Sequence, residues 1–367
     1  MKFSLLLPTF SILLFLSVRC QEVQPLPITG ETEKLNPQQM EEISETLSLF
    51  PENTQLALAI IEGGEVEFVG LKNEADSISI VANHEALFEI GSISKVFTGT
   101  LLAQMVQEGK LSLDESIDEK FDIPLADGIS ITFEQLANHS SGLPRIPPSM
   151  NMAAFFYPDN PYRAFTDEKM EDYLKAGPKP SSSKTGSYGY SNLGMGMLAY
   201  LMGKMEGKSY ADLLEDRVFT PLGMENSYGD WRLVEEGIVP GQNPKGNPTA
   251  NWDLGPLAGA GSIVSNVADL SRFAMAQFDS SRRDFQFSHQ PTLEVNAGLK
   301  VGLGWHWNIE SDGREVLWHN GGTGGYSSCM TLEPEMEQGV IILSNLSTFH
   351  NQRGKIDDLC FSLLSGL

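Results

Sequence analysis

Strand-like patterns lie at the two ends of this chain, and helix-like patterns fill its middle. Near the start, two apolar runs at 55–62 and 65–71 are joined by Gly63-Gly64, which predicts a β-hairpin. Near the end, four further segments predict strands: 303–310, 315–318, 326–333 and 339–343. Because strands must pair, this distribution predicts one sheet built from both ends of the chain, with a helical segment inserted between them.

Helical patterns account for most of the remaining residues. Asn36 followed by Pro37 predicts a helix start, and that helix reaches about Leu49. Thr132 and Gln135 form a capping-box pattern that predicts another start. Further helices are predicted over 92–108, 167–175, 190–205, 212–219 and 265–278, and from Asn351 onward. The chain therefore divides into a sheet domain, 36–108 with 256–367, and a helical region, 109–255.

The first twenty residues have the pattern of a secretory signal peptide. Lys2 precedes a mostly apolar run from Phe3 to Val18, and small residues permit cleavage before Gln21. A rival interpretation makes Cys20 the lipid-carrying N-terminus of a lipoprotein. We expect an exported protein, periplasmic or secreted, with a linker over 21–35. No apolar run predicts a stable membrane span.

Charge and composition exclude some partners. Acidic residues outnumber basic ones by 48 to 25, for a net charge of −23, which disfavours nucleic-acid binding. The six histidines and three cysteines show no metal-ligand spacing, so we expect neither a metal nor another cofactor. Removal of Cys20 would leave Cys329 and Cys360, which either pair as a disulfide or remain free thiols.

Ser92 and Lys95 are the first candidate catalytic residues. They lie three residues apart at a predicted helix start, so their side chains share one face. A serine hydroxyl is a weak nucleophile until a neighbour removes its proton or stabilises its anion, and a lysine can do either. A capping serine beside a surface lysine would give the same spacing, so the pair alone does not decide.

The residues around this pair extend the pattern. Phe88-Glu-Ile-Gly-Ser-Ile-Ser-Lys95 resembles the active-site signature of class C β-lactamases at all eight positions. The chain is identified on this basis as a member of the class C β-lactamase and penicillin-binding-protein-like serine hydrolase family. The resemblance implies an α+β fold, in which an antiparallel sheet flanked by helices lies beside an all-helical region. Ser92 is expected at the floor of the cleft between them.

Two later segments resemble the other motifs of this family. Tyr190-Ser-Asn192 resembles its Tyr-x-Asn motif, with Tyr190 as a base and Asn192 as a ligand for a substrate amide. A nearby lysine charge should favour the Tyr190 phenolate. His319-Asn-Gly-Gly322 resembles the Lys-Thr-Gly motif, in which Gly321 allows close approach and the Gly322 amide joins that of Ser92 in an oxyanion hole.

His319 stands where the family's enzymes usually carry lysine, and this departure bears on the substrate. A neutral histidine holds a substrate carboxylate less strongly than lysine does, and its charge depends on pH. The first motif favours β-lactam hydrolysis through a Ser92 acyl-enzyme. His319 favours an ester or a D-amino-acid peptide. A binding protein for peptidoglycan-like ligands that lacks catalysis is a third possibility. His139 is interpreted as structural.

Overall fold

The computed structural model describes residues 25–29, 35–126, 128–234 and 236–367. The predicted signal peptide, Cys20 and part of the predicted linker lie outside these residues. Residues 25–29 of that linker pack on the protein, since β1 (Ile28–Thr29) pairs with β4 (Ile78–Ile80). Within the described part of the chain, no helix is long and apolar enough to cross a membrane.

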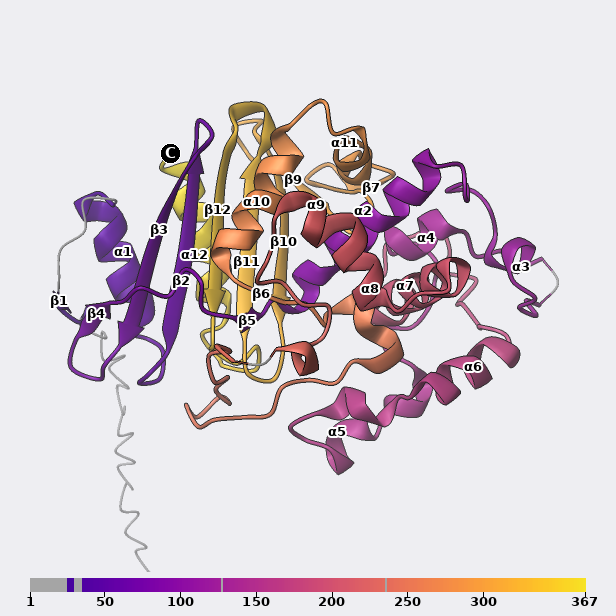
Figure 1. The fold of residues 1–367 in the computed structure, drawn as a ribbon, viewed down its shortest axis with the longest axis horizontal. Coiled ribbons are helices and arrows are strands. Elements are labelled where there is room, and N and C mark those ends of the chain that lie inside the picture. The colour runs from indigo at the N-terminus through magenta and orange to yellow at the C-terminus, as the bar shows by residue number, and fades with distance from the viewer. Residues whose placement is uncertain (1–24, 30–34, 127, 235) are drawn as a thin grey trace, which may run out of the picture.

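Most of the strands belong to one ten-stranded sheet (Figure 1), in the order β1-β4-β3-β2-β12-β11-β10-β9-β8-β7. The N-terminal hairpin and the C-terminal strands meet where β2 pairs with β12 in antiparallel register, with Ala59 opposite Ile341. This pairing confirms one sheet built from both ends of the chain. The sheet is antiparallel except at one edge, where the short β1–β4 pair is parallel. The remaining strands are β2 (Gln55–Glu62), β3 (Glu65–Asn73), β7 (Leu293–Asn296), β8 (Leu299–Val301), β9 (His306–Ile309), β10 (Glu315–Gly322), β11 (Ser327–Glu333) and β12 (Gln338–Ser344).

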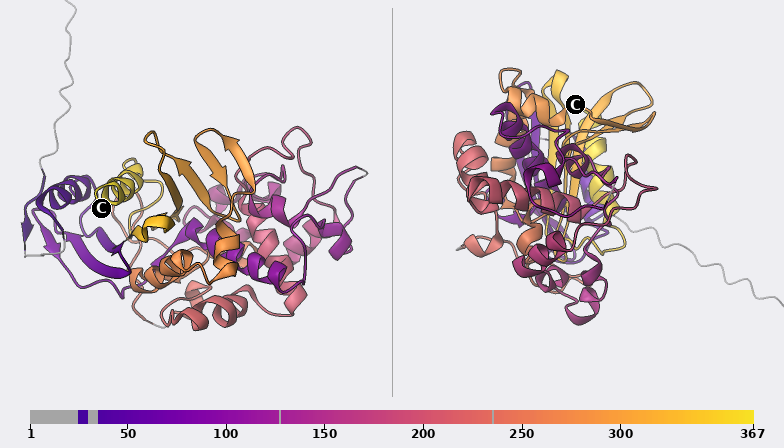
Figure 2. Two further views of the ribbon diagram at one scale, coloured as in Figure 1. Left: turned by 90° about the horizontal axis from the view of Figure 1, so that it is seen from above. Right: turned by 90° about the vertical axis from the view of Figure 1, so that its right-hand side faces the viewer.

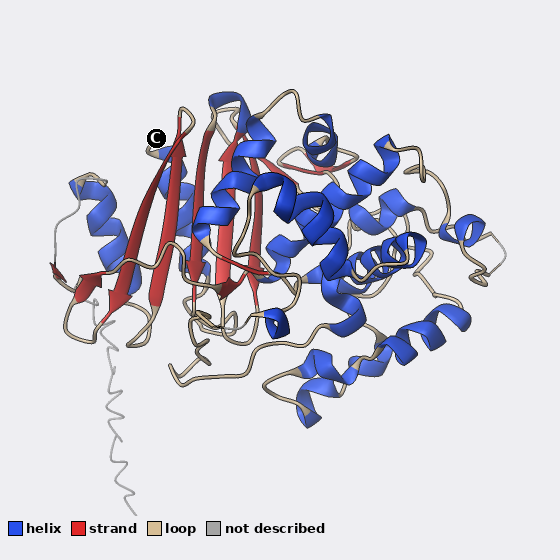
Figure 3. Ribbon diagram, viewed as in Figure 1, coloured by secondary structure: helices blue, strands red, loops and turns tan. Residues whose placement is uncertain are grey.

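Helices cover both faces of this sheet. Helices α1 and α12 pack on one face and α10 on the other (Figure 2). Figure 3 shows most of the other helices gathered beyond one edge of the sheet. This arrangement agrees with the prediction of a helical segment inserted between the two strand-rich ends of the chain. The helices are α1 (Pro37–Leu47), α2 (Ser94–Gln107), α3 (Ile117–Lys120), α4 (Phe133–Ala137), α5 (Ala153–Phe156), α6 (Asp167–Lys175), α7 (Asn192–Glu206), α8 (Tyr210–Leu214), α9 (Thr220–Leu222), α10 (Val267–Phe278), α11 (Arg283–His289) and α12 (Gly354–Ser365).

Strand β2 is buried on both faces, which explains its continuous apolar sequence. Leu56, Leu58 and Ile60 belong to the core beneath α1 and α12. The alternating residues Ala57, Ala59 and Ile61 belong to the larger core on the other face. Successive side chains of a strand point to opposite faces, so one strand contributes to two cores.

Two strand predictions had wrong boundaries. The strand predicted over 303–310 begins only at His306. Gly304 has φ +83°, and a Cβ there would lie 2.5 Å from the Lys95 carbonyl oxygen, so the chain turns tightly against α2 before β9 starts. The strand predicted over 315–318 continues to Gly322, because the glycine-rich segment pairs with β11. Strands β7 and β8 were not predicted.

The two cysteines of the folded chain are free, buried thiols. Cys329 lies on β11 and Cys360 on α12, within the same apolar core. The Cys360 thiol donates to the Val340 carbonyl oxygen at 3.3 Å. Of the two alternatives that the sequence left open, the structure has the free thiols.

A stack of aromatic rings joins α2, α10 and the loop before β9. Phe273 lies 3.8 Å from Phe97 and 6.3 Å from Trp305 between ring centroids. We expect Phe273→Ala to lower the free energy of unfolding by about 3–5 kcal/mol, because it leaves a cavity among buried rings. Chemical denaturation measures this. Met336→Ala, at an exposed position, is the control and should change stability by less than about 0.5 kcal/mol. Equal losses in both variants would contradict this account of the core.

Candidate active site

Ser92 lies in a tight turn between a short strand and the buried helix α2. The turn is a 3₁₀ segment, Gly91–Ile93, that follows β5 (Phe88–Glu89). Gly91 has φ +51°, and a Cβ at this position would lie 2.5 Å from the Gly322 amide nitrogen. Only glycine suits this conformation and this close approach. The end of β10 therefore lies directly against the residue that precedes Ser92.

Lys95 is fully buried, and its amine nitrogen contacts the Ser92 hydroxyl. The Lys95 Nζ atom is 3.0 Å from Ser92 Oγ and 2.6 Å from the Ala260 carbonyl oxygen. Burial lowers the pKa of Lys95 well below its ordinary value, and the Arg145 charge lowers it further. An amine whose neutral form is favoured can accept a proton, so Lys95 is suited to act as a base toward Ser92.

Tyr190 lies just before α7 and beside Lys95, with its ring centroid 4.8 Å from Lys95 Nζ. Ser191 caps this helix, since its Oγ accepts from the Gly194 amide at 2.9 Å and donates to the Pro144 carbonyl at 2.7 Å. Burial raises the pKa of Tyr190, and a hydrogen bond with Ser92 offsets only part of this rise. The predicted preference for phenolate was therefore wrong. A buried phenolate loses its hydration, and a neutral lysine supplies no compensating charge.

Asn192 is the first residue of α7, and its side-chain amide has a hydrogen-bond partner at the nitrogen but not, among the described residues, at the oxygen. Its Nδ2 donates to the Tyr162 hydroxyl at 2.7 Å. Its Oδ1 is buried, and no described residue donates a hydrogen bond to it. A buried acceptor without a donor is costly, so a substrate N–H is a suitable partner.

Gly321 and Gly322 bring β10 against the Ser92 turn. A Cβ on Gly321 would lie 2.0 Å from the Ile90 carbonyl oxygen and 2.9 Å from the Ser92 amide nitrogen. Such contacts exclude any side chain there. The sequence predicted close approach at these glycines, and the structure brings the amides of Ser92 and Gly322 to neighbouring positions.

His319 is buried on β10, 6.3 Å from the Tyr190 ring. Its Nδ1 hydrogen-bonds the Asn320 carbonyl oxygen at 2.5 Å. Burial lowers the pKa of His319 well below its ordinary value, and the nearby His306 and Lys95 lower it further. A neutral imidazole, not a cation, therefore occupies the position where the family's enzymes usually carry lysine.

Two other histidines pack behind this site. His306 lies 5.0 Å from His319 between ring centroids, and burial lowers its pKa to about 4. His139 lies 4.5 Å from the Tyr190 ring, and its Nδ1 accepts from the Ser191 amide at 3.3 Å. His139 therefore supports the start of α7, in line with the structural role predicted for it. His139 lies more than a hundred positions before His306 in the sequence, so the sequence contained no signal that these two rings lie close together. Within the described ranges, no three His, Cys, Asp or Glu side chains are arranged to hold a metal ion.

Glu89 is a functional-site residue that sequence reasoning missed. Its Oε1 accepts from the Trp252 amide at 3.0 Å and from Asn251 Nδ2 at 2.7 Å. Burial raises the pKa of Glu89 to about 7. Glu89 lies three residues before Ser92, so it ties the nucleophile's turn to the wall of the cleft. The sequence did offer one signal for Glu89, which is its position within the motif formed by residues 88–95.

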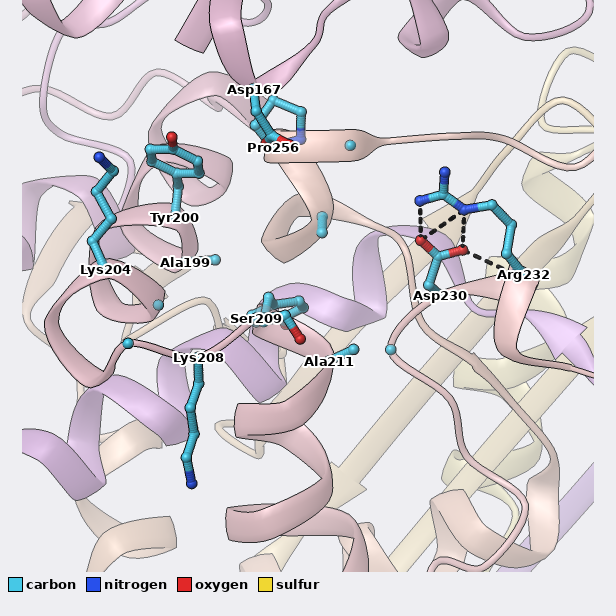
Figure 4. A pocket seen from close by; sticks show the side chains of 16 residues that line it. Asp167, Ala199, Tyr200, Lys204, Lys208, Ser209, Ala211, Asp230, Arg232 and Pro256 are labelled. Carbon is cyan, nitrogen blue, oxygen red and sulfur yellow. Dashed lines mark hydrogen bonds and ion pairs between the residues drawn. The ribbon is translucent and has the colours of Figure 1, made fainter. Parts of the chain in front are cut away.

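A small hollow opens above Ser92, and its lining carries no charged side chain. Trp252 and Tyr162 form an aromatic wall there, with ring centroids 5.1 Å apart. A larger open hollow lies elsewhere, beside α7 and α8 (Figure 4). The lining of that larger hollow includes the Asp230–Arg232 ion pair but none of the predicted site residues, so it is not the candidate active site.

The chain is similar to known proteins along most of its length. A family model described as Beta-lactamase matches residues 50–360. The D-alanyl-D-alanine-carboxypeptidase/endopeptidase AmpH of Escherichia coli K12 is 26% identical over 345 residues, covering 84% of this chain and 85% of that protein. Penicillin-binding protein 4* of Bacillus subtilis is 27% identical and covers 71% of this chain and 61% of its own length. The crystal structure of a beta-lactamase/D-alanine carboxypeptidase from Pseudomonas syringae has a TM-score of 0.70 at 21% identity, covering 89% of this chain and 97% of that one.

Ionisation of the buried Glu89 should destabilise the fold at neutral pH. Its folded pKa of about 7 lies above the ordinary value of 4.5, so its contribution is complete below pH 4.5 and is lost as pH rises through 7. Relative to Glu89→Gln, the wild type should lose about 3 kcal/mol of unfolding free energy between pH 4.5 and 8.5. Denaturation across this range measures the difference. Glu335→Gln, at an exposed position, should show no such trend, and parallel curves for Glu89→Gln and wild type would refute the expectation.

Proposed function

Because this chain belongs to the beta-lactamase family of serine hydrolases, we propose that it cleaves D-alanyl peptides through a Ser92 acyl-enzyme. The observation that carries the proposal is the 3.0 Å contact between Lys95 Nζ and Ser92 Oγ. A lysine whose neutral form is favoured by burial lies within hydrogen-bond distance of a serine in a glycine-shaped turn. This is the arrangement that activates a serine nucleophile.

The acylation step follows from this contact. Lys95 takes the Ser92 proton as Oγ forms a bond to the substrate carbonyl carbon, and the carbonyl π electrons move to oxygen. The amides of Ser92 and Gly322 donate hydrogen bonds to this oxyanion. Collapse of the tetrahedral intermediate breaks the C–N bond and releases the amine. The free Asn192 Oδ1 accepts a hydrogen bond from an amide N–H of the acyl group.

Tyr190 serves in this scheme as a proton donor. Its raised pKa keeps the phenol protonated, so it can give its proton to the departing nitrogen and regain one from the Lys95 ammonium. In deacylation, Lys95 accepts a proton from water as the water oxygen bonds to the ester carbonyl carbon. Lys95 then gives this proton to Ser92 Oγ as the C–O bond breaks, which releases the acid product and restores the enzyme. No step needs a metal or an organic cofactor.

The name of one relative supports a D-alanyl peptide as the substrate, because AmpH is called a D-alanyl-D-alanine-carboxypeptidase/endopeptidase. β-Lactam hydrolysis is a second candidate function, because all eight residues of 88–95 resemble the class C signature. Both substrates are amides that would acylate Ser92 in the same way.

A substrate panel tests the proposal. The mature protein is given a D-Ala-D-Ala peptide, nitrocefin and p-nitrophenyl butyrate, and initial rates are compared. We expect the peptide to be cleaved with release of D-alanine and nitrocefin to be turned over slowly. Ser92→Ala should lower every rate by about 10³-fold or more while the circular dichroism spectrum stays unchanged. A full rate in Ser92→Ala would reject the mechanism, and fast nitrocefin turnover without peptide cleavage would favour the second candidate.

The pH profile tests the role of Lys95. Because burial favours the neutral amine, kcat/KM for an uncharged ester should rise through one ionisation well below pH 10.5 and then level off. Lys95→Met should lose about 10²–10⁴-fold in kcat/KM. Lys300→Met, at a surface ion pair, is the matched control and should keep the wild-type profile. A wild-type rate that still climbs near pH 10 would show that Lys95 is not the base.

A further inference from the structure

Arg145 is a cation beside the reacting groups that the mechanism above does not use. We propose that Arg145 binds the carboxylate of the leaving group, the C-terminal carboxylate of a D-alanyl peptide. This inference rests on the proposed function, since it names the part of that substrate which a second residue recognises. No sequence motif pointed to Arg145.

The guanidinium of Arg145 has no acidic partner among the described residues, although the chain carries 48 acidic and only 25 basic residues. Other arginines hold carboxylates, as Arg217 holds Glu108 at 2.7 Å and Arg314 holds Glu333 at 2.9 Å. Arg145 instead lies over the Tyr190 ring, with Cζ 4.9 Å from the ring centroid. It is exposed, so an arriving anion can reach it.

The main chain holds Arg145 in this place. Its carbonyl oxygen accepts from the Asn192 amide at 2.9 Å and from the Leu193 amide at 3.2 Å, so it is bound to the first turn of α7. The preceding Pro144 carbonyl accepts from the Ser191 hydroxyl. The segment that presents Tyr190 and Asn192 to the substrate therefore also positions Arg145.

The charge of Arg145 acts inside the site. It lowers the pKa of the buried Lys95 and also that of His139. The geometry explains this influence, because Arg145 Cζ and Lys95 Nζ lie 4.9 and 4.8 Å from the centroid of the same Tyr190 ring. An anion placed near Arg145 would thus lie within the electrostatic range of the Ser92–Lys95 pair.

Other groups near Ser92 are poorly suited to bind a carboxylate. His319 is neutral, and Lys95 is buried and bonded to Ser92 and Ala260. Arg353 is paired with Asp357 and also donates to the Gly321 carbonyl at 3.3 Å. Arg145 thus supplies a free positive charge in a site where the usual lysine is absent, and its planar fork matches a carboxylate.

The two sides of the site indicate which part of the substrate Arg145 meets. The hollow lined by Tyr162 and Trp252 has no charge and suits the acyl group. Tyr190 gives its proton to the departing amine, so the leaving group lies on the Tyr190 side. In a D-Ala-D-Ala peptide that nitrogen and the C-terminal carboxylate belong to the same D-alanine residue, so the carboxylate lies on the side where Arg145 covers the Tyr190 ring.

Equilibrium binding tests this without relying on turnover. In a Ser92→Ala background, calorimetry measures the Kd of a diacetyl-L-Lys-D-Ala-D-Ala acid and of its C-terminal amide. We expect the acid to bind more tightly than the amide. Arg145→Gln should raise the Kd of the acid by about tenfold, because one charge-assisted interaction is lost, and should leave the Kd of the amide unchanged. Arg163→Gln is the matched control, because Arg163 also lies over a tyrosine ring, Tyr157 at 5.1 Å, and lacks an acidic partner among the described residues.

The outcomes separate the two proposals. Equal affinities for acid and amide, or an equal loss for both on Arg145→Gln, would overturn the role of Arg145. A similar loss of affinity for the acid in Arg163→Gln would also overturn this role, because the loss would then reflect the net charge of the protein rather than a specific binding site. In a third outcome, the acid binds more tightly than the amide in an Arg145-dependent way while the wild-type protein cleaves no D-peptide. That result would support the binding site and reject the proposed reaction.

Discussion

The rest of the site depends on the burial of Lys95, which removes its amine from water. Its amine hydrogen-bonds Ser92 Oγ and the Ala260 carbonyl, and removal from water favours its neutral form. A neutral amine at 3.0 Å from a hydroxyl makes serine chemistry available without a metal. Burial of Tyr190 likewise disfavours its phenolate, which supports the role of proton donor that we propose for it. Desolvation thus favours the neutral form of both groups.

Close backbone contacts create this burial. Gly91 and Gly321 let the end of β10 lie against the Ser92 turn, and Gly304 lets the chain turn against the Lys95 carbonyl. A Cβ at any of these positions would lie 2.5 Å or less from a backbone atom. A side chain there would force the sheet away from α2 and admit water to Lys95. The glycines are therefore electrostatic as well as steric determinants of the site.

Much of the fold could be predicted because its signals are local. The hairpin at Gly63-Gly64, the Asn36 cap and the order of strands and helices depend on residues close together in the chain. Boundaries failed where distant segments decide them. The chain is not a strand at Gly304, because it turns there against α2. The glycine-rich end of β10 is extended because β11 pairs with it. The motifs likewise named Ser92, Lys95, Tyr190, Asn192 and His319, which the structure brings together.

By itself the sequence determined the family, the one sheet formed from both ends, and the set of candidate catalytic side chains, because motifs and periodicities depend on neighbouring residues. Only the tertiary structure decided the charge states of those side chains. The pKa of Tyr190 rises and that of His319 falls because segments far apart in the chain exclude water from both. The free charge of Arg145 and the tie of Glu89 to Trp252 have the same origin, because each depends on which distant groups lie nearby.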